Sequence, residues 1–137
     1  MNLYIRGREE LHDLPELDLA ISINDPEDEV PEGIINRAGD VLRLSFHDAE
    51  DDESGFVLAQ DWHLARVCRR LEARPPQTLQ VQCTFGISRS PAVGLYAPGV
   101  LCPVLSTRQL VQTLLDVRPE AAPNGWFGWP RRTCTNS

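Results

Sequence analysis

The stretch Thr78–Val93, TLQVQCTFGISRSPAV, constrains the fold of this chain more than any other. Its first five residues form a short apolar run that predicts a buried strand, and Cys83 follows directly. Gly86 lies in the middle of the next segment, where a residue without a Cβ lets the backbone turn. Ser90 is a good N-cap and Pro91 suits the first turn, so we expect a helix to begin here. This order of strand, tight loop and helix predicts an anion site, because free backbone N–H groups and the helix dipole point the same way.

Cys83 and Arg89 are the candidate reactive pair of this stretch. A thiolate is a strong nucleophile, but a free cysteine is mostly a protonated thiol at neutral pH. Converging backbone amides and a neighbouring arginine both favour the thiolate. The planar fork of Arg89 can also bind two oxygens of a phosphate monoester at once. The loop would therefore bind the substrate dianion, activate the nucleophile and stabilise the transition state.

A cysteine, five further residues and Arg-Ser after a strand resemble the signature of the cysteine-dependent protein tyrosine phosphatases. The run GISRSPAV is most similar to the compact dual-specificity and bacterial tyrosine-phosphatase-like members. The resemblance covers about Leu17 to Asn124, and it implies that Cys83 is the nucleophile and that Ser90 eases its departure. It also implies a phosphate-binding loop, the phosphatase P-loop, made of Thr84, Phe85, Gly86, Ile87, Ser88 and Arg89. The alternative interpretation is a buried strand cysteine followed by an ordinary turn and helix.

The same resemblance implies that an aspartate, on a loop after another strand, protonates the leaving group. Asp48 directly follows the predicted strand Val41–Phe46 and precedes the cysteine by 35 residues. Asp51 and Asp52 are alternatives that lie further into the loop, where such acids often bind turn amides. We favour Asp48 because a strand end positions a side chain better than a loop tip does.

One departure from the family pattern lies next to the nucleophile. The family usually has His immediately before the cysteine, where it fixes the loop and favours the thiolate, but this chain has Gln82. A glutamine can still hydrogen-bond the loop, although it carries no charge. This substitution is compatible with a slower enzyme, and also with a pseudophosphatase that binds phosphorylated ligands without turnover.

Strand and helix patterns alternate along the chain, which predicts an α/β fold with a small, central, mostly parallel sheet flanked by helices. Ligands of such sheets bind beyond the carboxyl ends of the strands. We expect the helix after the loop to be short or kinked, because Pro98-Gly99 and Pro103 interrupt it. The aromatic residues Trp126, Phe127 and Trp129 are expected to pack onto the core. The predicted strands are Asn2–Arg6, Leu17–Asn24, Val41–Phe46 and Thr78–Gln82, and the other predicted helices are Gly7–Leu14, Leu58–Arg74 and Thr107–Val117.

Length and charge set further bounds on the chain. Its 137 residues fit a single domain, 1–137, with one core. The net charge of −7 argues against binding to nucleic acid or to an anionic membrane. No apolar run is long enough to span a bilayer. The four cysteines are widely spaced, which argues against zinc and against a disulfide framework and favours a soluble, cytoplasmic protein with reduced thiols: Cys68, Cys83, Cys102 and Cys134.

These observations predict a metal-independent phosphomonoester hydrolase that needs no cofactor. Arg89 is the sole cation of the loop, so a single monoester, on a phosphorylated protein or a small aryl phosphate, fits better than a polyphosphate. Two other functions remain open: the pseudophosphatase, and more distantly a rhodanese-like sulfur carrier, whose loop usually has a different length.

Overall fold

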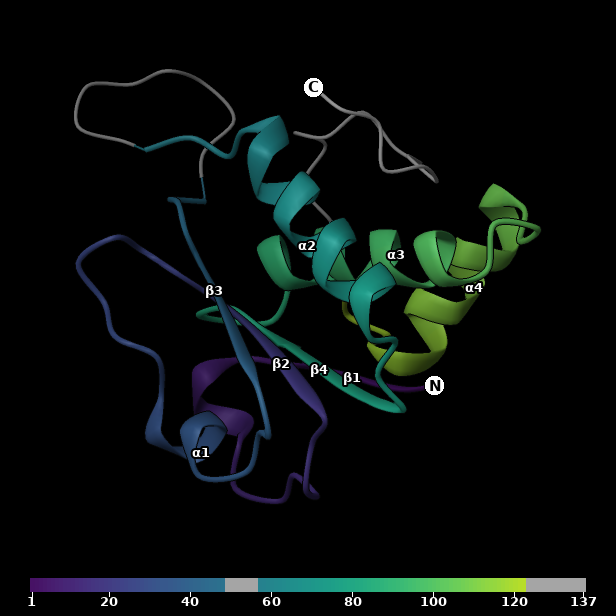
Figure 1. Cartoon of the computed structure of the whole chain (residues 1–137). Helices are drawn as coiled ribbons and strands as arrows, with labels where there is room; N and C mark the ends of the chain where they lie inside the picture. The colour runs from purple at the N-terminus through teal and green to yellow at the C-terminus, as the bar shows by residue number, and fades with distance from the viewer. Residues whose placement is uncertain (49–56, 123–137) are drawn as a thin grey trace.

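The computed structural model describes residues 1–48 and 57–122, and Figure 1 shows their arrangement. Within these ranges the structure has one four-stranded sheet, in which each neighbouring pair of strands is parallel. The α/β class predicted from the sequence is therefore confirmed. From one edge of the sheet to the other, the strands are β1 (Asn2–Arg6), β4 (Thr78–Gln82), β2 (Leu19–Asn24) and β3 (Val41–Ser45).

The strand register aligns the carboxyl ends of the strands. Gln82, the last residue of β4, pairs with Arg6 of β1 on one side and with Ser22 of β2 on the other. At the far edge Asn24 pairs with Ser45, the last residue of β3. The loops that follow the four strands therefore meet at the same edge of the sheet, where ligands of such sheets bind.

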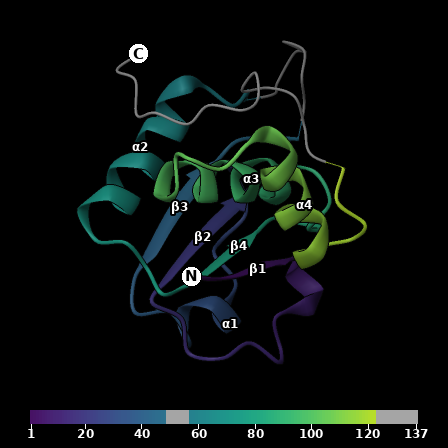
Figure 2. The same cartoon turned by 90° about the vertical axis from the view of Figure 1, so that its right-hand side faces the viewer.

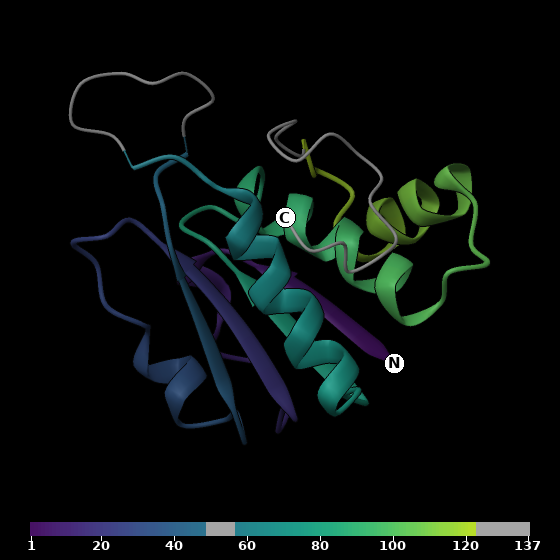
Figure 3. The same ribbon diagram turned by 45° about the horizontal axis from the view of Figure 1, so that its top comes forward.

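Helices cover both faces of the sheet (Figures 2 and 3). The longer helices α2 (Asp61–Ala73), α3 (Arg89–Leu101) and α4 (Thr107–Val117) lie on one face. The short helix α1 (Glu32–Ile35) and the 3₁₀ turn η1 (Arg8–Glu10) lie on the other. Within the described residues, no helix is long and apolar enough to span a membrane.

The main apolar core lies between the sheet and helices α2 and α3. Helix α2 contributes an apolar stripe to this core, and its members recur at helical spacing and are all buried: Leu64, Val67, Cys68 and Leu71. A smaller core on the opposite face joins η1, α1 and β2 through Leu11, Leu14, Leu17, Ala20 and Ile34. The three aromatic residues expected to pack onto the core, Trp126, Phe127 and Trp129, lie outside the described residues.

The cysteines of the described residues differ in state. Cys83 is buried and Cys102 is exposed, and both are free thiols. Cys68, on the buried face of α2, is fully buried and is disulfide-bonded. The expectation that the thiols of the chain are all reduced is therefore wrong for Cys68.

Most element boundaries agree with the predicted ones. β1, β4 and α4 occupy the predicted residues, and β2 and β3 are shorter than predicted by one or two residues at an end. Helix α2 begins at Asp61 rather than at Leu58. The segment Gly7–Leu14, predicted as a helix, forms only the three-residue turn η1.

The helix after the loop is not interrupted at Pro98-Gly99, contrary to the prediction, but it does end before Pro103. Helix α3 continues for 13 residues through Pro98 and ends at Leu101. A proline removes one helical hydrogen bond, but α3 is buried from Arg89 to Val100, so its packing against the sheet and α2 outweighs that loss. The start also differs, because Ser88 is the N-cap, and Ser90 is the second residue of the helix.

An ion pair joins the two ends of the described chain. The guanidinium of Arg118, the residue after α4, donates to both carboxylate oxygens of Glu10 in η1, at 2.8 and 2.6 Å. The hydrogen bond from Arg118 is the main cause that lowers the pKa of Glu10 from 4.5 to about 2. The same bond is the main cause that raises the pKa of Arg118.

This pair predicts a specific acid sensitivity. A carboxyl group whose folded-state pKa is depressed stabilises the fold above its unfolded pKa, and this stabilisation is lost as the pH falls through the folded value. The excess stability of the wild type over Glu10→Gln should therefore shrink as the pH falls from 4.5 towards about 2. Urea unfolding at a series of pH values measures this difference. The neighbouring variant Glu9→Gln serves as the control. If the difference in unfolding free energy between the wild type and Glu10→Gln does not change with pH, the ion pair is not the cause of the acid sensitivity.

Candidate functional site

Cys83 lies directly after β4, and its sulfur faces into the loop that follows. The residue is only 3% exposed. The backbone N–H of Gly86 donates to the Cys83 Sγ atom at 3.2 Å, and the Ser90 Oγ atom lies 3.1 Å from the same sulfur. Both groups can stabilise negative charge on sulfur, as a nucleophilic thiolate requires.

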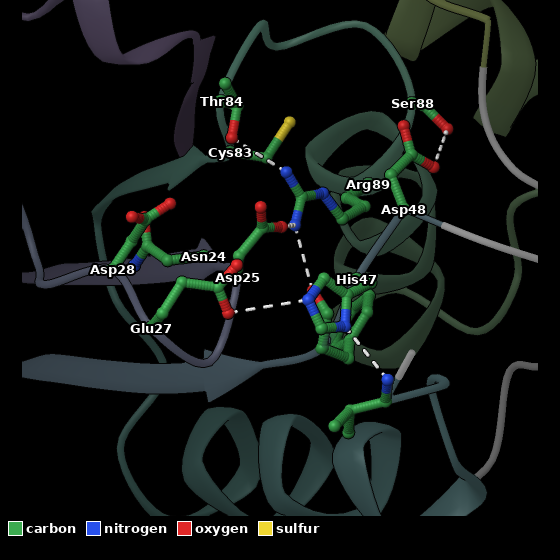
Figure 4. Close-up of polar contacts among 12 residues, drawn as sticks. Asn24, Asp25, Glu27, Asp28, His47, Asp48, Cys83, Thr84, Ser88 and Arg89 are labelled. Atoms are coloured by element: carbon green, nitrogen blue, oxygen red, sulfur yellow. Dashed lines mark hydrogen bonds and ion pairs between the residues drawn. The ribbon is translucent and has the colours of Figure 1, made fainter. Parts of the chain in front are cut away.

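The guanidinium of Arg89 is held at the mouth of the same loop (Figure 4). Its Nη1 atom donates to Asp25 Oδ1 at 2.7 Å and to the Phe46 carbonyl at 2.9 Å. Its Nη2 atom donates to Thr84 Oγ1 at 2.8 Å. Arg89 is only 4% exposed, and its Nε atom has no hydrogen-bond partner among the described residues.

Asp25 is a site residue that sequence reasoning missed. Its carboxylate accepts a hydrogen bond from Arg89, which lies 64 positions further along the sequence. The available signal was its position directly after the buried strand β2, at the carboxyl edge of the sheet where Cys83 was also expected.

Asp48, the favoured general acid, lies beside the loop. Its Oδ1 atom accepts a hydrogen bond from Ser88 Oγ at 3.0 Å (Figure 4). Ser88, a residue of the predicted phosphate-binding loop, thus directs its hydroxyl to the neighbouring aspartate. The alternatives Asp51 and Asp52 lie outside the described residues.

The predicted site residues border two adjoining recesses. The first, of about 270 Å³, is lined by Asp48, Cys83, Phe85, Ile87, Ser88 and Arg89. The second, of about 250 Å³, is lined by Asp25, His47, Asp48, Thr84, Phe85 and Arg89. A larger recess of about 480 Å³ includes Asp18, Arg70 and Pro76, residues from the opposite end of the strands. It has no nucleophile among its lining residues, so the smaller pair is the better candidate site.

Gln82, which stands where a histidine was expected, binds β2 rather than the loop. Its Oε1 atom accepts from Ser22 Oγ at 2.6 Å, and its Nε2 atom donates to Asn24 Oδ1 at 3.1 Å. The Asn24 amide donates to the Ser22 hydroxyl at 2.9 Å and closes a buried triangle. Arg8 adds a bond to Asn24 Oδ1 at 2.7 Å. The sequence-based suggestion that Gln82 could support the loop through its side chain is not met by these contacts.

Among the described residues, one cluster combines the side chains that metals prefer. Ligand atoms of Asp25, Glu27 and His47 lie within 4.8 Å of one another. The Nδ1 atom of His47 accepts the Val57 N–H at 2.9 Å, so a neutral ring carries its proton on Nε2, which faces Glu27 Oε2 at 3.5 Å. A protonated ring nitrogen cannot bind a metal, and Asp25 is engaged by Arg89. The cluster is therefore better suited to hydrogen bonding beside the site than to holding a cation.

The comparisons with known proteins support the fold independently of the site. No protein-family model matches the chain, and no curated protein matches its sequence. Solved structures do match. Human DUSP28 has a TM-score of 0.66 and 22% identity, over 91% of this chain and 85% of that one. Tk-PTP in its active form has a TM-score of 0.59 and 20% identity, over 92% and 86%. DUSP15 has a TM-score of 0.61 and 21% identity, over 92% and 78%. The chain therefore has a dual-specificity or tyrosine phosphatase-like fold.

The loop conformation predicts that Gly86 cannot be replaced. Gly86 has a φ of +73°, and an added Cβ would lie 2.7 Å from the Gly7 nitrogen. The left-handed backbone alone should cost Gly86→Ala about 1–2 kcal/mol of unfolding free energy. Gly39→Ala is the matched control, because its Cβ would meet no atom closer than 3.5 Å; it should change stability by less than about 1 kcal/mol. Equal unfolding free energies of the two variants, measured in urea, would contradict the described loop.

Proposed function

We propose that this protein is a metal-independent phosphomonoester hydrolase that acts through a cysteinyl-phosphate intermediate. The observation that carries the proposal is the meeting of Cys83, Arg89 and Asp48 at one recess. The fold shared with proteins of the dual-specificity and tyrosine phosphatase class adds support. Each of the three side chains offers one of the functions that phosphate ester cleavage requires: a nucleophile, an anion binder and a proton donor.

In the first step, the Cys83 thiolate attacks phosphorus, so that a sulfur–phosphorus bond forms and the bond from phosphorus to the leaving oxygen breaks. Asp48, in its protonated form, gives its proton to that oxygen. The buried Nε atom of Arg89 and the inward-facing N–H groups of the loop bind the phosphate oxygens. Their fixed positions stabilise the charge of the transition state without rearrangement during the reaction.

In the second step, water attacks the phosphorus of the intermediate and the sulfur–phosphorus bond breaks. The Asp48 carboxylate now takes a proton from the water. The Ser90 hydroxyl, 3.1 Å from the sulfur, can donate to the thiolate as it leaves. Phosphate is released, and both Asp48 and Cys83 return to their starting forms.

The loop also restricts the class of substrate. Among the described residues that line the recess beside Cys83, Arg89 is the one cationic side chain, and Asp48 lines the same recess. A single phosphate monoester, on a protein or on a small aryl alcohol, therefore fits better than a polyphosphate. Phe85 is 76% exposed at the rim, where its ring can contact the group that carries the phosphate.

The nucleophile assignment predicts an aryl phosphatase activity that resists a chelator. Hydrolysis of an aryl phosphate should continue in EDTA, and Cys83→Ser should abolish it because the hydroxyl is a far weaker nucleophile at neutral pH. Cys102→Ser replaces the exposed free thiol and should leave kcat/KM within about twofold of the wild type. Turnover that survives Cys83→Ser would remove the mechanism.

The acid assignment predicts a dependence on the leaving group. Asp48→Asn should lower kcat by a factor of about 10² to 10⁴ for a phosphate ester of a poor leaving group. The loss should be smaller for a nitrophenolate, which needs less protonation as it departs. Asp28→Asn is the control, because Asp28 lies near the site in Figure 4 but lines neither recess. An equal loss for good and poor leaving groups would assign the general acid to another residue.

A pseudophosphatase remains the second candidate, because Gln82 is neutral and directs its side chain to β2. A pseudophosphatase would bind inorganic phosphate in an Arg89-dependent manner, with no release of product from any phosphate ester. Turnover sensitive to Asp48→Asn would exclude it.

A further inference from the structure

The outer side of the loop carries a set of contacts that the proposed chemistry does not use. Four consecutive backbone carbonyl groups, those of residues 84–87, each accept a hydrogen bond from outside the loop. The donors come from the segment after β1 and from the segment after α4. The four bonds are Arg8 N–H to Thr84 O at 2.9 Å, Arg118 Nη2 to Phe85 O at 3.0 Å, Arg118 Nε to Gly86 O at 3.1 Å, and Ala122 N–H to Ile87 O at 2.7 Å.

These outer bonds determine what the inner side of the loop presents. A peptide group is planar and trans, so its carbonyl and the following N–H point in opposite directions. Carbonyls of residues 84–87 that point outwards therefore turn the N–H groups of residues 85–88 inwards. The Gly86 N–H is the direct example, because it lies 3.2 Å from the Cys83 sulfur while the Phe85 carbonyl of the same peptide group binds Arg118.

Arg118 provides two of the four outer bonds, and its guanidinium is fixed on several sides. The residue is only 8% exposed. Glu10 accepts from two of its nitrogens, and Glu120 Oε1 lies 2.8 Å from its Nε atom. The carboxylate of Glu10 also accepts from the Gly7 N–H at 2.9 Å, which limits its own movement. Glu10 therefore restrains two of the three nitrogens of the Arg118 guanidinium.

The charge of Arg118 acts in the same direction as its hydrogen bonds. The pKa of Arg118 is raised mainly by Glu10, and the negative charge of Cys83 adds to this shift. The guanidinium therefore places positive charge behind the loop, on the side of the backbone opposite to the Cys83 sulfur.

We propose that Arg118, oriented by Glu10, is a positioning residue that holds the loop in its anion-binding conformation without touching the anion or the sulfur. The proposal rests on the proposed function for its consequence in catalysis. Loss of the guanidinium leaves the Phe85 and Gly86 carbonyls without their donors, and the peptide groups are then free to turn. Oxyanion affinity and thiolate reactivity should fall together.

The test measures the reactivity of Cys83 without any substrate turnover. Iodoacetamide should alkylate Cys83, inorganic phosphate should slow this reaction, and peptide mapping separates it from alkylation of Cys102. In Arg118→Met, which keeps the volume but removes the donors, the phosphate concentration for half-protection should rise about tenfold or more. The rate of Cys83 alkylation at neutral pH should fall in the same variant.

Arg70→Met is the matched control. Arg70 is also largely buried and binds Asp40 at 2.8 Å, but it lies at the opposite end of the strands. It should lose stability in the same way as Arg118→Met while its phosphate protection stays within about twofold of the wild type. Arg118→Lys and Glu10→Gln keep the test open if Arg118→Met does not fold, and in both variants the phosphate concentration for half-protection should rise above that of the wild type.

The outcomes separate this proposal from the proposed function. Suppose that the wild type turns over no aryl phosphate, and that phosphate protection of Cys83 weakens in Arg118→Met or Arg118→Lys. The proposed enzymatic activity would then be wrong, and the role of Arg118 would be supported. Unchanged protection, alkylation and kcat/KM in a folded Arg118 variant would overturn that role and leave the phosphatase standing. Equal losses in the Arg118 and Arg70 variants would also overturn it, because they would indicate a general effect of stability.

Discussion

The orientation of the peptide groups in residues 84–88 is the constraint on which the rest of the site depends. Several N–H dipoles that converge on one point repel each other, and the loop needs partners that hold it in this form when no anion is bound. The chain provides them from behind, through backbone groups of Arg8 and Ala122 and the side chain of Arg118. The close packing also explains why Gly7 carries no side chain, since a Cβ there would lie 2.8 Å from the Phe85 carbonyl carbon.

These outer hydrogen bonds determine the geometry of the inner side of the loop. The Gly86 N–H donates to the sulfur and the Ser90 Oγ atom lies 3.1 Å from it, while Asp25 and Thr84 fix the guanidinium of Arg89. The arrangement of donors around the sulfur and of partners around Arg89 is thus already formed. Preorganisation of this kind lets a binding site stabilise a transition state without moving its own dipoles.

Local sequence patterns predicted the parts of this structure that depend on neighbouring residues. The strands, the loop after Cys83, the stripe on α2 and the location of Asp48 at a strand end follow from periodicity and from residues close in sequence. The contacts that fix the loop do not, because Asp25 and Arg89 are 64 positions apart, and Glu10 and Arg118 are 108 apart. Helix α3 continues through Pro98 for a related reason, because burial along the helix outweighs the tendency of a proline to end it.

The most direct test of this account is a crystal structure of the protein grown with inorganic phosphate. The account predicts one phosphate in the recess beside Cys83, with its oxygens accepting hydrogen bonds from the N–H groups of residues 85–88 and from Arg89 Nε. The carbonyls of Phe85 and Gly86 should still bind Arg118 on the far side. A loop whose carbonyls point towards the recess, or a phosphate bound to other residues with this recess left vacant, would contradict it.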